Sequence, residues 1–332
     1  MTCKTRILYL LIVLFAGLRM NAQFDAQFTQ YYVTPAFYNP AAAGNIDFLD
    51  IKAGAKLQWV GIDGAPKTFF LGASMPFMLF GKQKFGPGVQ IYQESIGLYK
   101  TLMAAAQISY KLKLFNGTFS IGIQPGFISQ TFKGSQIYIP QEEDSEPAVD
   151  EDLPSRDISG STFDLGAGIW YSRTRWWIGF SVSHITSPTV TFKSENQDNT
   201  TSVDGKTSYF EFSTLPCFYL MSGCNIPIKN TLFEINPSVL LKHTGSYTTA
   251  EATAIAGWKK MFYAGLSYRW DEAVSIILAA EIKGVYLGYS YDYPTTAISR
   301  ASKGSHELVA GYRLKIDLDK NNRHKYKSIR LM

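Results

Sequence analysis

The stretch that decides the fold is "TFSIGIQPGFISQ", residues 118–130. Every second position is apolar, at Phe119, Ile121, Ile123, Pro125 and Phe127, and the residues between them are small or polar. A period of two places alternate side chains on opposite faces of a β-strand. This stretch therefore predicts a strand with one apolar face and one polar face.

The same alternation recurs along the chain and predicts 14 strands, at 49–60, 67–77, 86–94, 100–113, 118–131, 162–172, 176–185, 215–226, 231–243, 249–258, 261–270, 273–282, 285–293 and 305–316. Tight connections alternate with long ones, of which 132–161, 186–214 and 294–304 are the longest. Outer-membrane barrels join their strands by short periplasmic turns and long outside loops. We therefore expect an all-β fold, a transmembrane antiparallel outer-membrane β-barrel over residues 49–316 with both chain ends in the periplasm. A β-sandwich or propeller is the soluble alternative, but no blade-length repeat supports a propeller.

The tryptophans give an independent indication. All six lie at the ends of predicted strands, at Trp59, Trp170, Trp176, Trp177, Trp258 and Trp270. Aromatic girdles at the two membrane interfaces place them there, whereas a soluble sandwich buries tryptophan in mid-strand.

The N-terminus has the features of a secretory signal. Lys4 and Arg6 precede an apolar run over residues 7–17, and Ala22 supplies the small residue before a cleavage site at Gln23. The apolar run is too short for a membrane-spanning helix, which needs roughly 20 residues. We expect residues 1–22 to be removed and the chain to reach the outer membrane.

The charged residues are distributed unevenly. The predicted tight turns carry bases without acids, at Lys82, Lys84, Arg173, Arg175, Lys229, Lys259, Lys260 and Lys283. The run 141–152, "QEEDSEPAVDED", is acidic and is either a solvated loop or a surface for cations or a basic partner. The basic tail, residues 317–332, is expected to extend into the periplasm.

The pattern does not favour catalysis. Ser183 and His184 are neighbours, as are Ser305 and His306, so the two side chains of each pair point to opposite faces of a strand. Neither the histidines nor Cys217 and Cys224 have the spacing of metal ligands, and two cysteines seven residues apart in one strand are too distant to bridge. We expect no enzyme activity, no cofactor, no metal and no nucleic acid.

The polar face of the predicted strands carries charges. They are Lys52, Lys56, Asp164, Glu234, Arg269, Glu281, Glu307 and Arg313. Inside a barrel such groups either pair across neighbouring strands or line a path for solutes. A barrel of 14 strands is wider than its own side chains fill, so something else must occupy the lumen or the barrel leaks.

The segment 23–48 is the candidate for that role. It contains "TQYYVTPAFYNPAAAG" (29–44), which has many aromatic residues, two prolines and no charge. The prolines keep it out of the middle of a sheet, so we expect it to pack at the periplasmic barrel mouth as a plug or a docking site.

Several motifs resemble one family. "QFTQYYVTPAFYNPAAAG" (27–44) and "QWVGIDGAPKTFFLGAS" (58–74) are similar to specific motifs of the PorP/SprF family, the outer-membrane barrels of type IX secretion and gliding in Bacteroidota. "TFDLGAGIWY" (162–171), "PSVLLKH" (237–243) and "GSHELVAGYRL" (304–314) resemble its later strands. The resemblance runs from about residue 24 to residue 316 and is weakest in the strand motifs.

The resemblance implies a non-enzymatic role in the secretion and gliding machinery. The implied partners are periplasmic, peptidoglycan-associated components, secreted sorting-domain proteins or adhesins, and outer-membrane lipids. It points to Tyr31, Pro35, Tyr38, Asn39, Pro40 and Gly44 as plug or partner-binding residues, and to Trp59, Gly61, Gly64 and Pro66 as a first-loop motif. A porin-like or lipid transporter, and an outward-facing adhesin anchor built on the long loops, remain as alternatives.

Overall fold

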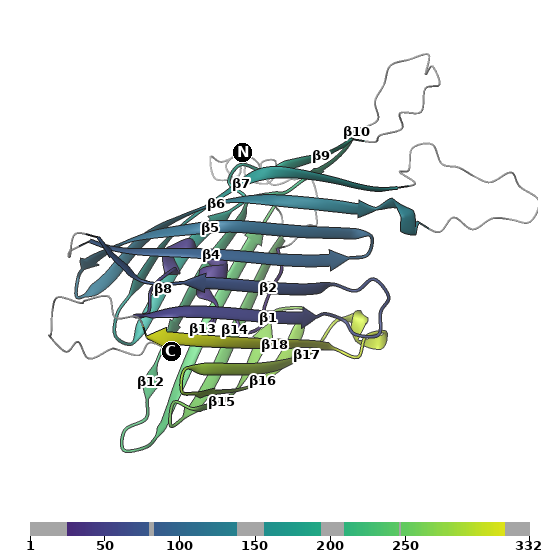
Figure 1. The fold of residues 1–332 in the computed structure, drawn as a ribbon. Helices are drawn as coiled ribbons and strands as arrows, with labels where there is room; N and C mark the ends of the chain where they lie inside the picture. The colour runs from purple at the N-terminus through teal and green to yellow at the C-terminus, as the bar shows by residue number, and fades with distance from the viewer. Residues whose placement is uncertain (1–24, 80–82, 138–155, 194–208, 246, 316–332) are drawn as a thin grey trace, which may run out of the picture.

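Fourteen antiparallel strands close into one barrel (Figure 1). The structure is a computed structural model that describes residues 25–79, 83–137, 156–193, 209–245 and 247–315. The strands are β1 (Phe48–Leu57), β2 (Lys67–Ser74), β4 (Gln83–Ile96), β5 (Tyr99–Leu114), β6 (Gly117–Lys133), β7 (Asp157–Ser172), β8 (Trp176–Ser183), β11 (Cys217–Cys224), β13 (Phe233–Thr244), β14 (Tyr247–Trp258), β15 (Phe262–Arg269), β16 (Ala273–Ile282), β17 (Val285–Pro294) and β18 (Ser305–Lys315). Each predicted strand has a counterpart here.

Closure comes from two pairings between distant parts of the sequence. β1 pairs with β18, and β11 lies between β8 and β13, so every barrel strand has a neighbour on both sides. Two short strands, β3 (Phe77–Leu79) and β12 (Ile226–Pro227), only lengthen the wall beside β4 and β13. A closed ring has no unpaired edge, which is the condition for a sheet in lipid.

The strand β9 (Thr189–Lys193) and the strand β10 (Tyr209–Ser213) form a separate hairpin inside a connection that the sequence predicted to be a loop. The Val190 side chain is fully buried and packs at Gly160 of β7. The hairpin therefore packs against β7 near the beginning of that strand.

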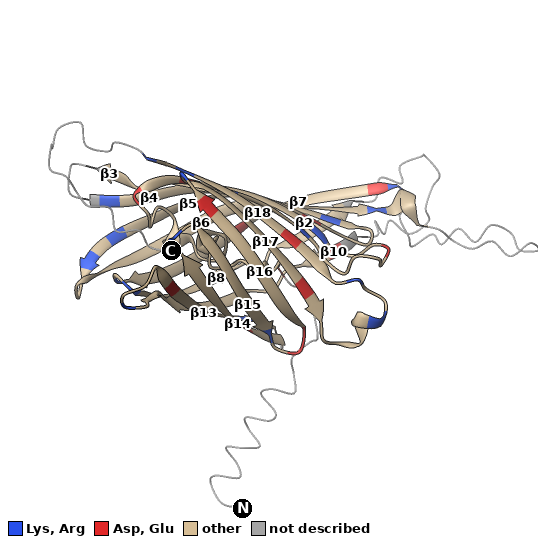
Figure 2. Cartoon of the chain, turned by 90° about the horizontal axis from the view of Figure 1, so that it is seen from below, with Lys and Arg blue, Asp and Glu red and all other residues tan. Residues whose placement is uncertain are grey.

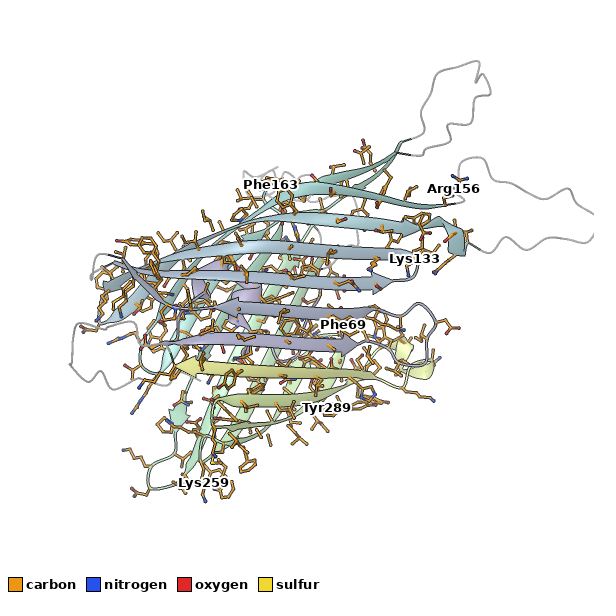
Figure 3. All side chains as sticks on the ribbon, in the orientation of Figure 1. Phe69, Lys133, Arg156, Phe163, Lys259 and Tyr289 are labelled. Atoms are coloured by element: carbon orange, nitrogen blue, oxygen red, sulfur yellow. The ribbon has the colours of Figure 1, made fainter. Side chains whose placement is uncertain are left out.

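The two faces of the wall differ as the alternation predicts. Phe69, Phe163 and Tyr289 point away from the barrel, with exposed fractions of 50%, 47% and 41% (Figure 3). The charged set predicted for the polar face lies inside, where Lys56, Asp164 and Glu307 are at most 3% exposed. An apolar outer face with a polar interior is the arrangement of a membrane barrel. None of the helices among the described residues is long and apolar enough to cross a membrane.

The two ends of the barrel differ in their connections. At one end, which we call the turn end, Phe115–Asn116 and Lys283–Gly284 have positive φ at both residues and close two-residue turns. Such turns follow the right-handed twist of the flanking strands. The other end, the loop end, carries the connections 58–66, 134–156, 184–216 and 295–304. It also carries tight turns, such as Gly97–Leu98, so the alternation of tight and long connections is less regular than expected.

The tryptophan prediction was only partly correct. Trp176, Trp258 and Trp270 are 40%, 39% and 64% exposed at strand ends on the outer face. Trp170 is 4% exposed and stacks on Trp177 with a ring-centroid distance of 4.7 Å. Successive side chains of a strand point to opposite faces. Trp170 follows the outward Ile169 and Trp177 follows the outward Trp176, so both rings point into the barrel. They belong to the lumen and not to the girdle.

Basic side chains gather at the turn end. Among the described residues of this end, Asp47 is the one exposed acid. The exposed bases are Lys84, Lys113, Arg173, Arg175, Lys229, Lys259, Lys260, Lys283 and Lys315. Figure 2 shows this end at the left, where β3 lies. Lys82, the acidic run 141–152, the signal segment and the tail 317–332 lie outside the described residues.

The closing register predicts a new disulfide. Cys217 lies opposite Thr244 in the β11–β13 pairing, and paired Cα atoms in antiparallel strands fall within the range that a disulfide spans. In Thr244→Cys, we expect a bond between residues 217 and 244 under oxidising conditions, identified by mass spectrometry of the linked peptides. His243→Cys is the control, because its side chain points to the other face and should stay unlinked to Cys217. A bond from residue 244 to Cys224 would contradict the register.

Candidate functional site

The candidate site is the interior of the barrel, which the N-terminal segment, residues 25–47, occupies. The short helix α2 (Pro35–Tyr38) and the 3₁₀ turn η1 (Pro40–Ala42) belong to this segment and lie between the near and far walls in Figure 1. Phe28, Tyr31 and Ala41 are fully buried, and Tyr38 and Asn39 are 1% exposed. The segment is therefore packed into the lumen along most of its length.

Local sequence explains the turns of this segment. Pro35 and Pro40 stand at the first positions of α2 and η1, where a missing N–H leaves no gap in the helix hydrogen bonds. The side chain of Asn39 accepts a hydrogen bond of 2.9 Å from the N–H of Ala41 and so caps η1. Asn39 also donates to the carbonyl oxygens of Ile169 and Phe180, at 2.9 and 3.2 Å. One amide thus fixes both the turn and its place on the wall.

Glycines on the inner face of the wall make room for the segment. A Cβ atom at Gly122 would lie 2.3 Å from the nitrogen of Ala41, and one at Gly86 would lie 2.0 Å from the oxygen of Ala43. At Gly168 it would lie 2.2 Å from Asn39 Oδ1. The backbone of the segment and the Asn39 side chain therefore pack directly on the strands, at distances that only glycine in the strand allows.

A cluster of buried charges holds the segment near the loop end. The N–H groups of Thr29 and Gln30 donate to the carboxylate of Glu307, at 2.7 and 3.0 Å. The Thr29 hydroxyl donates to Asp292 at 2.9 Å. Lys56 Nζ lies 3.0 Å from that Asp292 carboxylate and 3.7 Å from Glu307. Wall charges and segment thus satisfy one another, which is what buried ionic groups require.

Neighbouring charges extend this cluster. Arg269 Nε lies 2.9 Å from Glu251, and Gln27 donates to the same Glu251 carboxylate at 3.0 Å. Glu251 and Asp292 were not among the residues that the sequence singled out. The alternation of the two faces alone could have identified them, since Glu251 and Asp292 both lie at inward positions of their strands.

A second anchor holds the start of the described chain. The His184 ring lies 2.7 Å from the carboxylate of Asp25 and 3.0 Å from that of Asp164. Tyr219 donates to the other oxygen of Asp25, and Lys242 donates to its carbonyl oxygen. No local pattern connects Asp25 with His184, since they are 159 residues apart.

The charge state of this anchor follows from its surroundings. His184 lies in the connection after β8, outside the strands. Burial alone lowers the pKa of its imidazole, but the carboxylates of Asp25 and Asp164 outweigh this and raise the pKa to about 10. Burial alone would raise the pKa of the Asp25 carboxyl. The positive charges of His184 and Lys242 lower it by more, so the net shift of this pKa is downward. The anchor is an ion pair at neutral pH.

The direction of the segment differs from the sequence expectation. Asp25 and Thr29 meet side chains near the loop end, and Ala43 and Asn45 meet Lys111 of β5 near the turn end, at 2.8 and 2.7 Å. We expected a segment packed at the mouth on the turn side, with its beginning there. Instead it runs the length of the lumen, because the glycine track and both anchors lie on the inner wall.

The predicted partner-binding or plug residues lie together in this segment. The hydroxyl of Tyr31 is 3.0 Å from Ser238 Oγ, and that of Tyr38 accepts from the N–H of Phe28 at 2.8 Å. Gly44 has φ of +63°, and a Cβ there would lie 2.6 Å from the oxygen of Met75. Their contacts in the described chain are internal.

The predicted first-loop motif lies elsewhere, in the β1–β2 connection at the loop end. Trp59, Gly61 and Gly64 have φ values of 49°, 102° and 71°, and Gln58 donates to the oxygen of Pro66 at 2.9 Å. Val60 donates to the oxygen of Gly304 at 2.8 Å, joining this loop to the β17–β18 connection. The motif shapes a turn and does not reach the segment.

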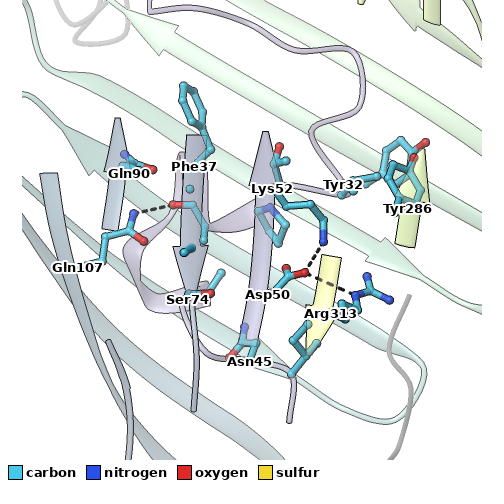
Figure 4. Close-up of a pocket in the computed structure, with 18 of the residues that line it drawn as sticks. Tyr32, Phe37, Asn45, Asp50, Lys52, Ser74, Gln90, Gln107, Tyr286 and Arg313 are labelled. Carbon is cyan, nitrogen blue, oxygen red and sulfur yellow. Dashed lines mark hydrogen bonds and ion pairs between the residues drawn. The ribbon is translucent and has the colours of Figure 1, made fainter. Parts of the chain in front are cut away.

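One cavity of about 160 Å³ remains beside the segment, in the turn-end half of the lumen (Figure 4). Residues 32–37 form one side, and the aromatic rings Trp170, Trp177, Tyr263 and Tyr286 are on the wall. Asp50 pairs with Lys52 and lies 3.6 Å from Arg313, which is itself 3.0 Å from Glu281. The charged side chains of this cavity thus form ion pairs with one another along the wall, and do not line an open path for ions.

Among the described residues, no group of His, Cys, Asp and Glu could hold a metal ion. The described cysteines, Cys217 and Cys224, are both free.

Comparison with known proteins gives a family and a set of similar structures. A family model for the type IX secretion system membrane protein PorP/SprF matches residues 20–312. The toluene transporter TodX of Pseudomonas putida is 10% identical, with 88% of this chain and 95% of that chain covered and a TM-score of 0.47. A FadL homologue of Pseudomonas aeruginosa is 11% identical, with 84% and 93% covered and a TM-score of 0.43. No curated protein matches. At these values the similar structures say nothing about what this chain binds.

The charge cluster at Thr29 predicts that the loss of one wall cation loosens the segment. In Lys56→Met, the carboxylates of Asp292 and Glu307 lose their nearest cation, and removing one partner of a buried pair costs about 3–5 kcal/mol. We expect a lower Tm of the detergent-solubilised barrel and faster hydrogen exchange over residues 25–34. Lys67→Met removes an exposed lysine near the same end and should change neither. Equal behaviour of the two variants would mean that the cluster does not hold the segment.

Proposed function

This chain belongs to the PorP/SprF family of type IX secretion system membrane proteins, and we propose that it acts as a closed outer-membrane platform of that machinery. Its N-terminal segment is the plug. Its turn end faces the periplasm and docks a peptidoglycan-associated component, while its loops assist the export or surface anchoring of sorting-domain proteins or adhesins.

The observation that carries this proposal is the occupied lumen. Two charge clusters and a track of inner-face glycines fix residues 25–47 across the space that a transporter would leave open. Removing such a segment would take the Thr29 and Gln30 donors from Glu307 and Asp292, and would leave His184 without the carboxylate of Asp25. A resting state with the lumen closed therefore fits a platform better than a porin.

Three features support docking at the turn end. Short turns face the periplasm in outer-membrane barrels, so the turn end is the one that periplasmic proteins can reach. This end is basic, and the segment reaches it at Asn45, to which Lys111 donates a hydrogen bond of 2.7 Å. The strand β18 ends there at Lys315, and the basic tail 317–332 follows it in the sequence. A complementary acidic partner would be both attracted and oriented by these charges.

A small-solute or lipid transporter is the second candidate, and the cavity beside the segment is the observation that favours it. It would need the segment to move, since the segment and the paired wall charges occupy the rest of the path.

Conductance separates the two functions. In planar bilayers we expect the protein with an intact segment to be silent and a protein lacking residues 23–47 to conduct. Gly122→Ala should leak, because its Cβ would meet Ala41 at 2.3 Å, whereas Gly72→Ala has its nearest atom at 3.7 Å and should stay closed. Conduction by both the intact and the shortened protein would favour the transporter.

Docking is tested by cross-linking in intact outer membranes, followed by purification of the barrel. We expect a periplasmic secretion component to be recovered, and to be lost when 317–332 is deleted. We expect the same loss when Tyr38 and Asn39, which are buried and hold the segment in the lumen, are changed to alanine. Shortening 141–152 is the control and should affect external partners only. Folding of each variant is checked by its heat-modifiable migration. Unchanged recovery of the periplasmic component in both variants would refute docking.

A further inference from the structure

The N-terminal segment lines the cavity of about 160 Å³ described above but does not fill it, and the residues around it indicate a ligand. A cavity of similar volume in other proteins accommodates a benzene ring. Its lining is mainly apolar and includes aromatic rings from both the segment and the wall, with the stacked rings of Trp170 and Trp177 4.7 Å apart. Such a space fits one aromatic or large aliphatic side chain better than a sugar or an ion.

The approach to this cavity is basic. Three of its aromatic residues follow closely after an exposed basic turn residue: Trp177 after Arg175, Tyr263 after Lys260 and Tyr286 after Lys283. Each turn therefore brings an exposed cation to the turn end, two or three residues before a ring of the lining. Ser172, another residue of the lining, is followed at once by the exposed Arg173. A ligand that carried positive charge would be repelled along this route.

The cavity is reached from the turn end. Lining residues nearest that end, such as Asn45, Ser172 and Arg313, are partly exposed, whereas those toward the loop end are covered by the N-terminal segment. Inside the cavity, the Tyr263 hydroxyl has no hydrogen-bond partner within the described protein although the residue is 6% exposed. It can donate to a backbone carbonyl of a bound chain.

We propose that the cavity is the receptor for an acidic protein segment of a periplasmic partner, which inserts one aromatic or large aliphatic side chain between Trp177 and Tyr263 while its flanking carboxylates pair with the basic rim. This rests on the proposed docking function and specifies the chemistry of the docked partner. The buried side chain supplies the anchor of the contact, and the rim supplies orientation and rate of encounter.

The test uses the full-length protein in detergent and a synthetic peptide with a central phenylalanine between two pairs of acidic residues. Binding is measured by fluorescence anisotropy of the labelled peptide. We expect replacement of the phenylalanine by serine to weaken binding at least about ten-fold. A peptide with lysines in place of the acids should not bind, and added salt should weaken the acidic peptide.

Variants of the protein locate the site. Gly72→Phe places a ring in the cavity and should abolish binding of the phenylalanine peptide. The double variant Arg175→Gln with Lys283→Gln should weaken binding and reduce its salt dependence. Lys67→Gln with Lys303→Gln removes the same charge at the loop end and should leave binding unchanged. The barrel fold of each variant is confirmed by its heat-modifiable migration.

The outcomes are separable from those of the docking experiment. Peptide binding that ignores the phenylalanine, or that survives Gly72→Phe, overturns the receptor cavity. No peptide binding, together with recovery of a periplasmic partner in cross-linking, also overturns it but leaves the docking function standing. If loss of the loop-end lysines alone weakens binding, the site lies at the other end and the inference is wrong.

Discussion

The constraint on which the structure depends is the closed ring of 14 strands. In lipid every backbone N–H and C=O group needs a partner within the protein, so the sheet must return to its own first strand. The β1–β18 pairing does this over ten residue pairs, from Phe48 with Lys315 to Leu57 with His306. Closure then dictates which face meets lipid and which faces a lumen.

The lumen creates the second requirement. A ring of this size encloses more space than the side chains of its wall fill. The chain fills the space with its own N-terminal segment, which needs both a smooth surface and fixed ends. Gly86, Gly122 and Gly168 provide the surface, and the charge clusters at Thr29 and Asp25 provide the fixed end. The small remaining cavity is a consequence of packing an irregular segment against a regular wall.

The buried charges have a double role in this account. Lys56, Arg269 and the carboxylates around them pair across strands, and the same carboxylates accept hydrogen bonds from the backbone of Thr29 and Gln30. Wall and segment are therefore one electrostatic unit, in which loss of a single member leaves other buried charges uncompensated. This coupling holds the segment in the lumen.

The amino-acid sequence by itself determined the strands, their two faces and the barrel class, because a period of two and the turn residues are local properties of the chain. It also indicated that residues 29–44 stand outside the sheet, since their prolines cannot join it. It did not determine that Asp25 meets His184, that Trp170 and Trp177 turn inward as a stacked pair, or that the segment runs through the lumen. Those contacts join residues far apart in sequence, and only barrel closure and strand register decide which inward side chains become neighbours.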